Sequence, residues 1–294
     1  MSETHEADTE NARFVQGLAA TDGELESPVD LDISYMKVIE LSPLQWINID
    51  VAPRKVKITN TGYTVILSAK WQQKRPYLCG GPFTENYIFS QIHFHWGENE
   101  MNGSEHYIDG ASMPMELHAV HFKSEYETLD TALRRPDGVT ILVYFIKVSP
   151  SLQNEPNKFM EEIVKNLASI QSTDSSVRIV PIQLTNIMRP FNDDYFLYWG
   201  SIVTISNVHK ILWVISRVPI GVSVEQVAEF RTLTDEKGVP ILSNIRVLKE
   251  RQNRNIFHVC PSGSTYASLL PLPRDYSNNE TDEPSDVSND TPEN

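Results

Sequence analysis

Two histidines stand two residues apart in the segment "FSQIHFHWGENE" (89–100), and this spacing suits a metal ion. Side chains alternate across a β-strand, so in a strand His93 and His95 would point the same way, about 7 Å apart along it. Two imidazoles at that spacing can meet one ion. The pair is equally compatible with two polar side chains that backbone groups satisfy, so both interpretations stay open at this point.

A third histidine follows in "MELHAVHF" (115–122), where Glu116 and His118 share one face of an expected strand. If this strand pairs antiparallel with the first one, His118 completes a set of three nitrogens. Three neutral nitrogens with a fourth position open is the arrangement of catalytic rather than structural zinc sites. The sequence therefore predicts that His93, His95 and His118 bind Zn²⁺.

Two polar side chains are placed to orient these ligands. Gln91 lies two residues before His93, and Glu116 lies two residues before His118, each on the face of its histidine. Metal-bound imidazoles usually donate their other N–H to a carboxylate, an amide or a carbonyl. A lone buried carboxylate is costly, so a histidine partner explains Glu116. The alternative is that Glu116 is exposed on an edge strand.

The elements that must position these residues are mainly short strands separated by turn residues. The expected strands lie within residues 55–67 (two strands around an Asn-Thr-Gly turn), 87–96, 115–122, 139–148 and 211–220. Helical periodicity appears in residues 157–171 and 223–233, and the second segment has a capping-box pattern at Ser223 and Gln226. Strands and helices do not alternate regularly, so we expect one α+β domain, mainly β, around a large mixed sheet.

The formal net charge of −14 belongs to the two ends of the chain. Residues 1–26 carry seven acidic residues and one basic, and residues 275–294 carry seven acidic residues and none basic. Segments of this composition bury too little apolar surface to offset the entropy lost on ordering. We therefore predict a domain over residues 27–262 between acidic, disordered segments at 1–26 and 263–294. The C-terminal tail is interpreted as a solubilising extension or a partner-binding segment.

Composition also bears on partners and compartment. An acidic chain without a basic patch in its sequence argues against nucleic acid as a partner. No secretory signal is visible at the N-terminus, and no apolar run approaches the roughly 20 residues that span a bilayer. The two cysteines are too few for a disulfide framework. A cytoplasmic protein with reduced thiols is expected, and a secreted one only if the true start differs.

Several segments together resemble the alpha-class carbonic anhydrases of eukaryotic type. The matching stretches run from Ser27 to Val259 and include "SPVDLD", "QIHFHWG", "GSEHYID", "ELHAVHF", "RRPDGV", "YWGSIVT" and "VSVEQVAEFRTL". The resemblance implies a single domain on a twisted, mostly antiparallel ten-stranded sheet with short outer helices. It also implies a monomeric, zinc-dependent enzyme that hydrates carbon dioxide reversibly to bicarbonate and a proton.

The resemblance assigns further residues. It matches His93, His95 and His118 to the zinc ligands, and it matches the partners of these ligands to Gln91, Glu116 and the backbone carbonyl of Asn244. It places Glu105 behind the site and treats His106 and His121 as structural. The apolar wall for carbon dioxide corresponds to Val120, Val139, Ile141, Ile202 and Trp213.

One departure from the family lies in "GSIVTIS" (200–206), where Val203 replaces a threonine and Thr204 is retained. In the family this threonine links the zinc-bound hydroxide to the glutamate at Glu105. Valine has nearly the same shape, but its side chain neither donates nor accepts. Glu105 is therefore expected to lose its partner and to find water or become protonated, and turnover is expected to fall.

A second departure lies in "TNTGYTV", where Tyr63 replaces the proton-shuttle histidine of the efficient family members. Histidine titrates near neutral pH, whereas the reference pKa of a tyrosine phenol is near 10. Ile66 also makes the mouth of the site more apolar. Two functions then compete: a slow carbonate dehydratase, and a carbonic-anhydrase-related protein that binds zinc but serves as a non-catalytic binding module. All three zinc histidines are kept, which favours the enzyme.

Overall fold

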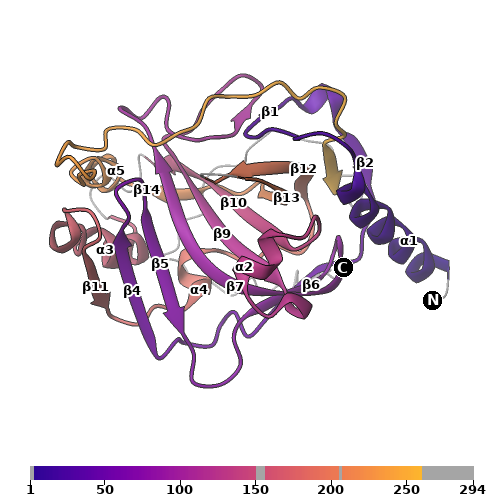
Figure 1. The fold of residues 1–294 in the computed structure, drawn as a ribbon, viewed down its shortest axis with the longest axis horizontal. Coiled ribbons are helices and arrows are strands. Elements are labelled where there is room, and N and C mark those ends of the chain that lie inside the picture. The colour runs from indigo at the N-terminus through magenta and orange to yellow at the C-terminus, as the bar shows by residue number, and fades with distance from the viewer. Residues whose placement is uncertain (1–2, 150–155, 205–206, 260–294) are drawn as a thin grey trace, which may run out of the picture.

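The computed structural model describes residues 3–149, 156–204 and 207–259. Within these ranges one 13-stranded sheet dominates, and ten of its strands follow one another in the order β11-β4-β5-β7-β9-β10-β13-β12-β15-β2. Most neighbours are antiparallel; the pairs β10–β13, β10–β14 and β15–β2 are parallel. Figure 1 shows the sheet crossing the molecule, with α3 and α5 at one side and α1 at the other. The predicted fold class is confirmed.

The sheet contains β2 (Lys37–Ile39), β3 (Leu44–Ile47), β4 (Lys55–Asn60), β5 (Val65–Lys70), β6 (Tyr77–Gly80), β7 (Phe83–Trp96), β9 (Met115–Lys123), β10 (Val139–Val148), β11 (Ser176–Ile179), β12 (Tyr195–Val203), β13 (Val208–Ser216), β14 (Ile220–Val222) and β15 (Phe257–Val259). Strands β1 (Asp30–Leu31) and β8 (Tyr107–Ile108) pair separately. The helices are α1 (Glu3–Gly17), α2 (Leu129–Leu133), α3 (Lys158–Val164), α4 (Leu184–Ile187) and α5 (Val224–Phe230).

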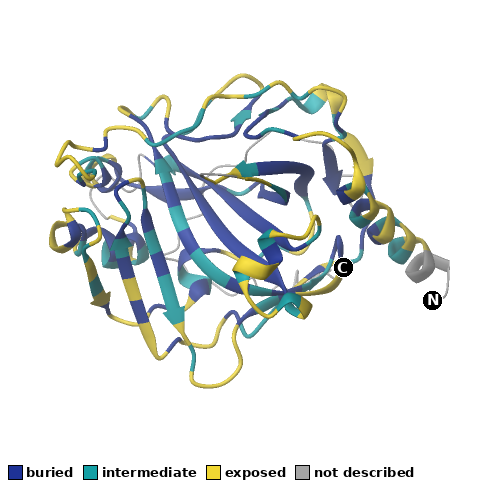
Figure 2. Cartoon of the chain, in the orientation of Figure 1, coloured by how far each residue is buried: buried dark blue, intermediate teal, exposed yellow. Residues whose placement is uncertain are grey.

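The central strands are buried on both faces because an apolar cluster covers each face (Figure 2). Every residue of β9 is buried, and so are the first eight residues of β10. One cluster contains Phe94, Leu117 and Leu142, and the other contains Ile141 and Trp213. The continuous apolar run at 139–148 predicted such a strand, and its bounds are those of β10.

Strand β7 contains a bulge at Ser90 that changes which residues face which cluster. Phe89 lies opposite His121 and Gln91 lies opposite Val120, so Ser90 is an extra residue. Before the bulge the odd-numbered residues enter the larger cluster, and after it the even-numbered residues do so. The members are Tyr87, Phe89, Ile92, Phe94 and Trp96. The bulge therefore leaves Gln91, His93 and His95 together on the opposite face.

The prediction that residues 1–26 are disordered is wrong for the described residues, because α1 packs on the sheet (Figure 1). Ala12, Val15 and Ala19 are buried, and their spacing of three and four residues forms one apolar stripe. The indole N–H of Trp199 donates to the Val15 carbonyl at 2.7 Å. The prediction rested on the composition of residues 1–26 as a whole, which does not reveal a short apolar stripe. The ordered domain therefore begins well before residue 27.

The predicted disordered tail at 263–294 and the predicted domain boundary at 262 lie outside the described residues, so both stay predictions. Among the residues that are described, no helix is long and apolar enough to cross a membrane. The monomeric state and the cytoplasmic location stay predictions.

The capping box predicted for α5 is present. The Ser223 hydroxyl accepts from the Gln226 N–H, and the Gln226 side chain accepts from the Ser223 N–H, both at 3.2 Å. Replacing Ser223 by alanine removes the oxygen that satisfies a free N–H at the helix start. We expect the free energy of unfolding to fall by about 1 kcal/mol.

Urea unfolding measures this loss. Ser223→Thr is the matched control, because it keeps the oxygen and should stay near the wild type. Equal stability of the alanine and threonine variants would contradict a role for the cap.

Candidate metal centre

The three predicted ligands converge from two adjacent strands. In the β7–β9 register His93 lies directly opposite His118, and His95 is two residues further along the same face. One nitrogen from each of the three rings can be chosen so that all three lie within 4.8 Å of one another. His93 Nε2 and His118 Nδ1 are 3.2 Å apart. The antiparallel pairing that the sequence required is therefore present.

Each imidazole has a partner on its outer nitrogen. His93 Nδ1 lies 3.3 Å from Gln91 Oε1, and His95 Nδ1 lies 3.2 Å from the Asn244 carbonyl oxygen. His118 Nε2 lies 2.5 Å from Glu116 Oε1. These oxygens only accept, so the outer nitrogen of each ring carries the proton. The nitrogens that keep a lone pair for a metal ion are His93 Nε2, His95 Nε2 and His118 Nδ1.

One of these inner nitrogens is buried without a hydrogen-bond partner. His95 Nε2 finds none among the described residues. A buried polar atom without a partner is costly, and native proteins seldom leave one unexplained. A metal ion bound by the three inner nitrogens would satisfy this atom. The donor set, three imidazole nitrogens and no thiolate, fits Zn²⁺ with an open fourth position.

Electrostatics keep two of the ligands neutral. Burial is the main cause that lowers the pKa of His93 well below its usual value, and the neighbouring His118 adds to the effect. Burial likewise lowers the pKa of His95 to about 4, although Glu105 opposes the shift. Both rings are therefore uncharged at neutral pH, as metal ligation requires.

Glu116 is buried and accepts three hydrogen bonds, so it is not an exposed edge residue. It accepts from His118 on Oε1, from His106 Nδ1 on Oε1 at 2.7 Å, and from the His106 backbone N–H on Oε2 at 2.8 Å. Burial alone would raise the pKa of Glu116, but the contacts with His106 and His118 lower it well below its usual value. The His106 Nε2 is 2.7 Å from the Tyr198 hydroxyl.

The two histidines expected to be structural have their own partners. Both nitrogens of His106 are engaged, so the second group whose geometry could hold a metal, His106 with Glu116 and His118, offers no free lone pair on that ring. His121 Nδ1 lies 3.0 Å from the Ala119 carbonyl, and its ring packs edge-on against Phe89. Burial lowers the pKa of His121 to about 4.

The expectation that Glu105 lacks a partner is wrong. The Arg246 guanidinium donates from Nε to Glu105 Oε1 at 2.8 Å and from a terminal nitrogen to Oε2 at 2.5 Å. The Arg246 backbone N–H also donates to Oε1. Burial raises the pKa of Glu105, but His95 and Arg246 lower it well below its usual value. This two-point pairing keeps the buried carboxylate ionised.

The residues expected to form the apolar wall gather beside the histidines. Val120, Ile141 and Trp213 lie in one cross-strand row, and the Trp213 ring centre is 5.1 Å from that of His118. The full set belongs to one apolar cluster, with four members buried and Ile202 partly buried: Val120, Val139, Ile141, Ile202 and Trp213. An apolar surface therefore borders the imidazole of His118.

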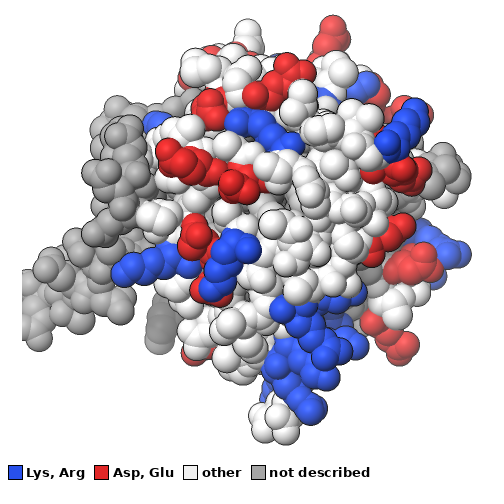
Figure 3. All heavy atoms as spheres, turned by 90° about the vertical axis from the view of Figure 1, so that its left-hand side faces the viewer, with Lys and Arg blue, Asp and Glu red and all other residues white. Residues whose placement is uncertain are grey.

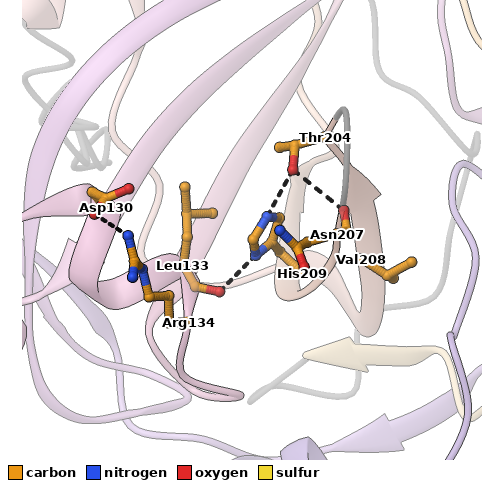
Figure 4. Close-up of a pocket in the computed structure, with 7 residues that line it drawn as sticks. All are labelled: Asp130, Leu133, Arg134, Thr204, Asn207, Val208 and His209. Carbon is orange, nitrogen blue, oxygen red and sulfur yellow. Dashed lines mark hydrogen bonds and ion pairs between the residues drawn. The ribbon is translucent and has the colours of Figure 1, made fainter.

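Strand β12 ends at Val203, and the next residue, Thr204, lines a cavity of about 760 Å³ (Figure 4). Val203 is 65% exposed. The Thr204 hydroxyl lies 3.0 Å from His209 Nε2, and His209 Nδ1 lies 2.7 Å from the Leu133 carbonyl. Sequence reasoning gave His209 no role, although its hairpin spacing from Thr204 could have indicated the contact. The bond from His209 to the Leu133 carbonyl ties the β12–β13 hairpin to the end of α2.

Tyr63 lies in the β4–β5 turn with 70% of its surface exposed. Its carbonyl accepts from Asn244 Nδ2 at 2.9 Å, and Asn244 Oδ1 accepts from the Trp96 N–H at 2.8 Å. Ile66 lies directly opposite His93 in the β5–β7 register. Asn244 thus ties the turn that carries Tyr63 to the end of the strand that carries His95.

Comparison with known proteins agrees with this geometry. A family model described as eukaryotic-type carbonic anhydrase matches residues 11–260. A protein named carbonic anhydrase 1 from Monodelphis domestica is 31% identical over 240 residues, which cover 80% of this chain and 88% of that protein. Proteins of the same name from Oryctolagus cuniculus and Mus musculus are each 30% identical over 240 residues, 80% of this chain and 98% and 89% of theirs.

Proposed function

Because this chain belongs to the eukaryotic-type carbonic anhydrase family, we propose that it hydrates carbon dioxide reversibly with Zn²⁺ held by His93, His95 and His118. The observation that carries the proposal is the convergence of three imidazole nitrogens, one of them buried without a partner. Zinc content and carbon dioxide hydration, measured on one preparation, test it. Zinc without turnover would favour a non-catalytic binding module.

The protein's own groups would prepare the ligands. Gln91, Glu116 and the Asn244 carbonyl hold the protons on the outer nitrogens, which fixes the tautomers and ring directions before any ion binds. When bound there, Zn²⁺ supplies the Lewis acidity that lets water act as a nucleophile near neutral pH, as is established for carbonic anhydrases themselves.

The substrate would lie against the apolar wall. Carbon dioxide is small and carries no net charge, so a surface without competing hydrogen-bond donors suits it. Val120, Ile141 and Trp213 provide that surface on the same face as His93 and His118. The product bicarbonate is charged, so the same surface favours its release into water.

Reduced turnover follows from two side chains in this proposal. Val203 brings no hydroxyl that could orient the attacking oxygen or donate to the Glu105 carboxylate. Tyr63 lies in the exposed turn and replaces the proton-shuttle histidine of the efficient family members. Both steps, attack and proton release, are therefore expected to be slower than in family members with threonine and histidine at these positions.

Proton release is expected to depend on buffer. A phenol does not exchange protons near pH 7 as an imidazole does, so small imidazole buffers should raise turnover of the wild type. Tyr63→His should raise turnover at low buffer and reduce the buffer dependence. Stopped-flow hydration at increasing imidazole concentration measures both effects.

Tyr63→Phe is the matched control, because it removes only the hydroxyl. It should behave as the wild type does. A clear loss of turnover in Tyr63→Phe, or no response to buffer in any variant, would show that proton release does not depend on this position as argued.

A further inference from the structure

Four exposed cations lie together on one face of β5, β4 and β11. The register places Lys57 opposite Arg178 and Lys55 opposite Lys70. Lys55 and Lys57 are two residues apart, so all four side chains share a face. Figure 3 shows Lys and Arg side chains gathered at the lower end of the side of the molecule on which Figure 1 places β4 and β11. We call Lys55, Lys57, Lys70 and Arg178 the basic patch.

The basic patch has no counter-charge among the described residues. All four side chains are exposed, and none forms an ion pair or a side-chain hydrogen bond within that part of the chain. Directly opposite residues in a sheet lie about 5 Å apart, and like charges there destabilise the pairing. The patch therefore concentrates positive charge on a protein whose formal net charge is −14.

Protection of a sheet edge does not explain the basic patch. Lysines on edge strands discourage the pairing of one sheet with another. Within the described sheet only Arg178 lies on an edge strand, whereas Lys57 at the centre of the patch has a partner on both sides, Arg178 and Ser68. The basic patch could not be predicted from the sequence, because its members come from three segments separated by up to 123 positions in the numbering, 55 to 178.

The basic patch is separated from the strand that carries His93 and His95 by about one Debye length or more, so solvent ions weaken its effect on these ligands. Lys57 and Gln91 lie in the same cross-strand row, with Ser68 between them. Two strand spacings of about 4.8 Å separate their backbones. The long side chains carry the charges further out into solvent, where the Debye length is about 8 Å at physiological salt. A binding role at the patch itself explains the cluster better.

We propose that the basic patch docks the acidic segment 275–294 of the same chain. That segment has seven acidic residues and no basic one, and it holds the carboxylates that the patch lacks. A tethered segment has a high effective concentration, whereas an external polyanion would be repelled by the net charge. The other acidic segment is not available, because α1 lies at the opposite side of the molecule (Figure 1).

The chain between the two is long enough. Strand β15, which ends at Val259, is seven strand positions from β4 in the sheet order, or about 34 Å at 4.8 Å per strand. Residues 260–274 could span at most about 50 Å when extended at 3.3 Å per residue. The acidic segment begins after that span, so its carboxylates can reach the basic patch. This inference is independent of the zinc chemistry.

A zero-length carbodiimide, EDC, tests the docking on the full chain, because it joins a carboxylate to an amine only when they touch. We expect intramolecular links between residues 275–294 and Lys55, Lys57 or Lys70, identified by mass spectrometry on the monomer band. Salt should reduce them about fivefold or more at 1 M, where the Debye length is only about 3 Å.

Lys37 is the matched control for simple proximity. It is exposed on β2, directly opposite Phe257 of β15, and so lies much closer to the start of the tail than the basic patch does. If docking depends on the cluster of cations, links to Lys37 should be several times fewer than links to Lys57. Links to Lys37 that equal or exceed those to the patch would overturn the proposal.

Two variants separate charge from chemical reactivity. The double change Lys57→Glu with Arg178→Glu should abolish links at Lys55 and Lys70, although both amines remain. Lys57→Arg should lose only its own link, because the charge is kept. Links found only in a crosslinked dimer would show that a second copy of the chain occupies the patch. The absence of links to the patch at low salt would show that the acidic segment does not bind there. Either result overturns the proposal.

Discussion

Replacing His95 by alanine is expected to leave the purified protein without zinc, whereas the wild type should carry about one ion per chain. The inner nitrogen of His95 is the buried atom without a partner, so an ion at this site removes a cost that the apo protein bears. Two histidines cannot complete the three-nitrogen set. Elemental analysis after purification without chelators measures the metal content.

His121→Ala is the control for a merely buried histidine. His121 lies on the same strand as His118, is equally buried, and bonds a backbone carbonyl instead of facing the other rings. It should keep its zinc, and circular dichroism should show that both variants are folded. A zinc-free wild type, or a His95→Ala protein that still holds one ion, would remove the basis of the proposed function.

Val203→Thr is expected to raise carbon dioxide hydration by about ten- to a hundredfold. The new hydroxyl would accept a hydrogen bond from the attacking oxygen and donate one to Glu105. One hydrogen bond to a charged group is worth about 1.5–3 kcal/mol, and 1.4 kcal/mol is tenfold in rate. Arg246 does not block this bond, because Glu105 Oε2 accepts from one Arg246 nitrogen and has a second lone pair.

Stopped-flow assays over about pH 6–9 make the comparison, because the wild type is expected to gain activity toward alkaline pH and the variant to be active at neutral pH. Val208→Thr is the matched control. Val208 lies directly opposite Val203 in the hairpin and is also exposed, so the same change there should leave the rate unaltered. A zinc-loaded Val203→Thr protein without a gain would favour the binding-module interpretation.

The strands and the ligand set were within reach of sequence reasoning because their signals are local. A spacing of two residues fixes the shared face of His93 and His95, and the continuous apolar run at 139–148 marks a strand buried on both faces. The capping box at Ser223 is likewise complete within four residues. These patterns need no knowledge of the rest of the chain.

Contacts between distant segments were not within reach. Arg246 and Glu105 are 141 residues apart, and nothing in either segment indicates that a guanidinium will meet that carboxylate. The basic patch combines three segments in the same way. Helix α1 was missed for another reason, since the seven acidic residues among positions 1–26 dominate the composition and conceal the few apolar residues, such as Ala12 and Val15, that are buried.

The bulge at Ser90 has a consequence for how this strand can change over evolutionary time. Successive side chains in a strand point to opposite faces, so residues 89 and 92 would face opposite sides of a regular strand. The extra residue Ser90 lets both Phe89 and Ile92 enter the same core. Substitutions in this stretch alter single contacts. An insertion or deletion between the two halves would exchange the sides of every residue beyond it, including both ligands. The length of the segment from Tyr87 to Trp96 is therefore under stricter constraint than the identity of most of its residues.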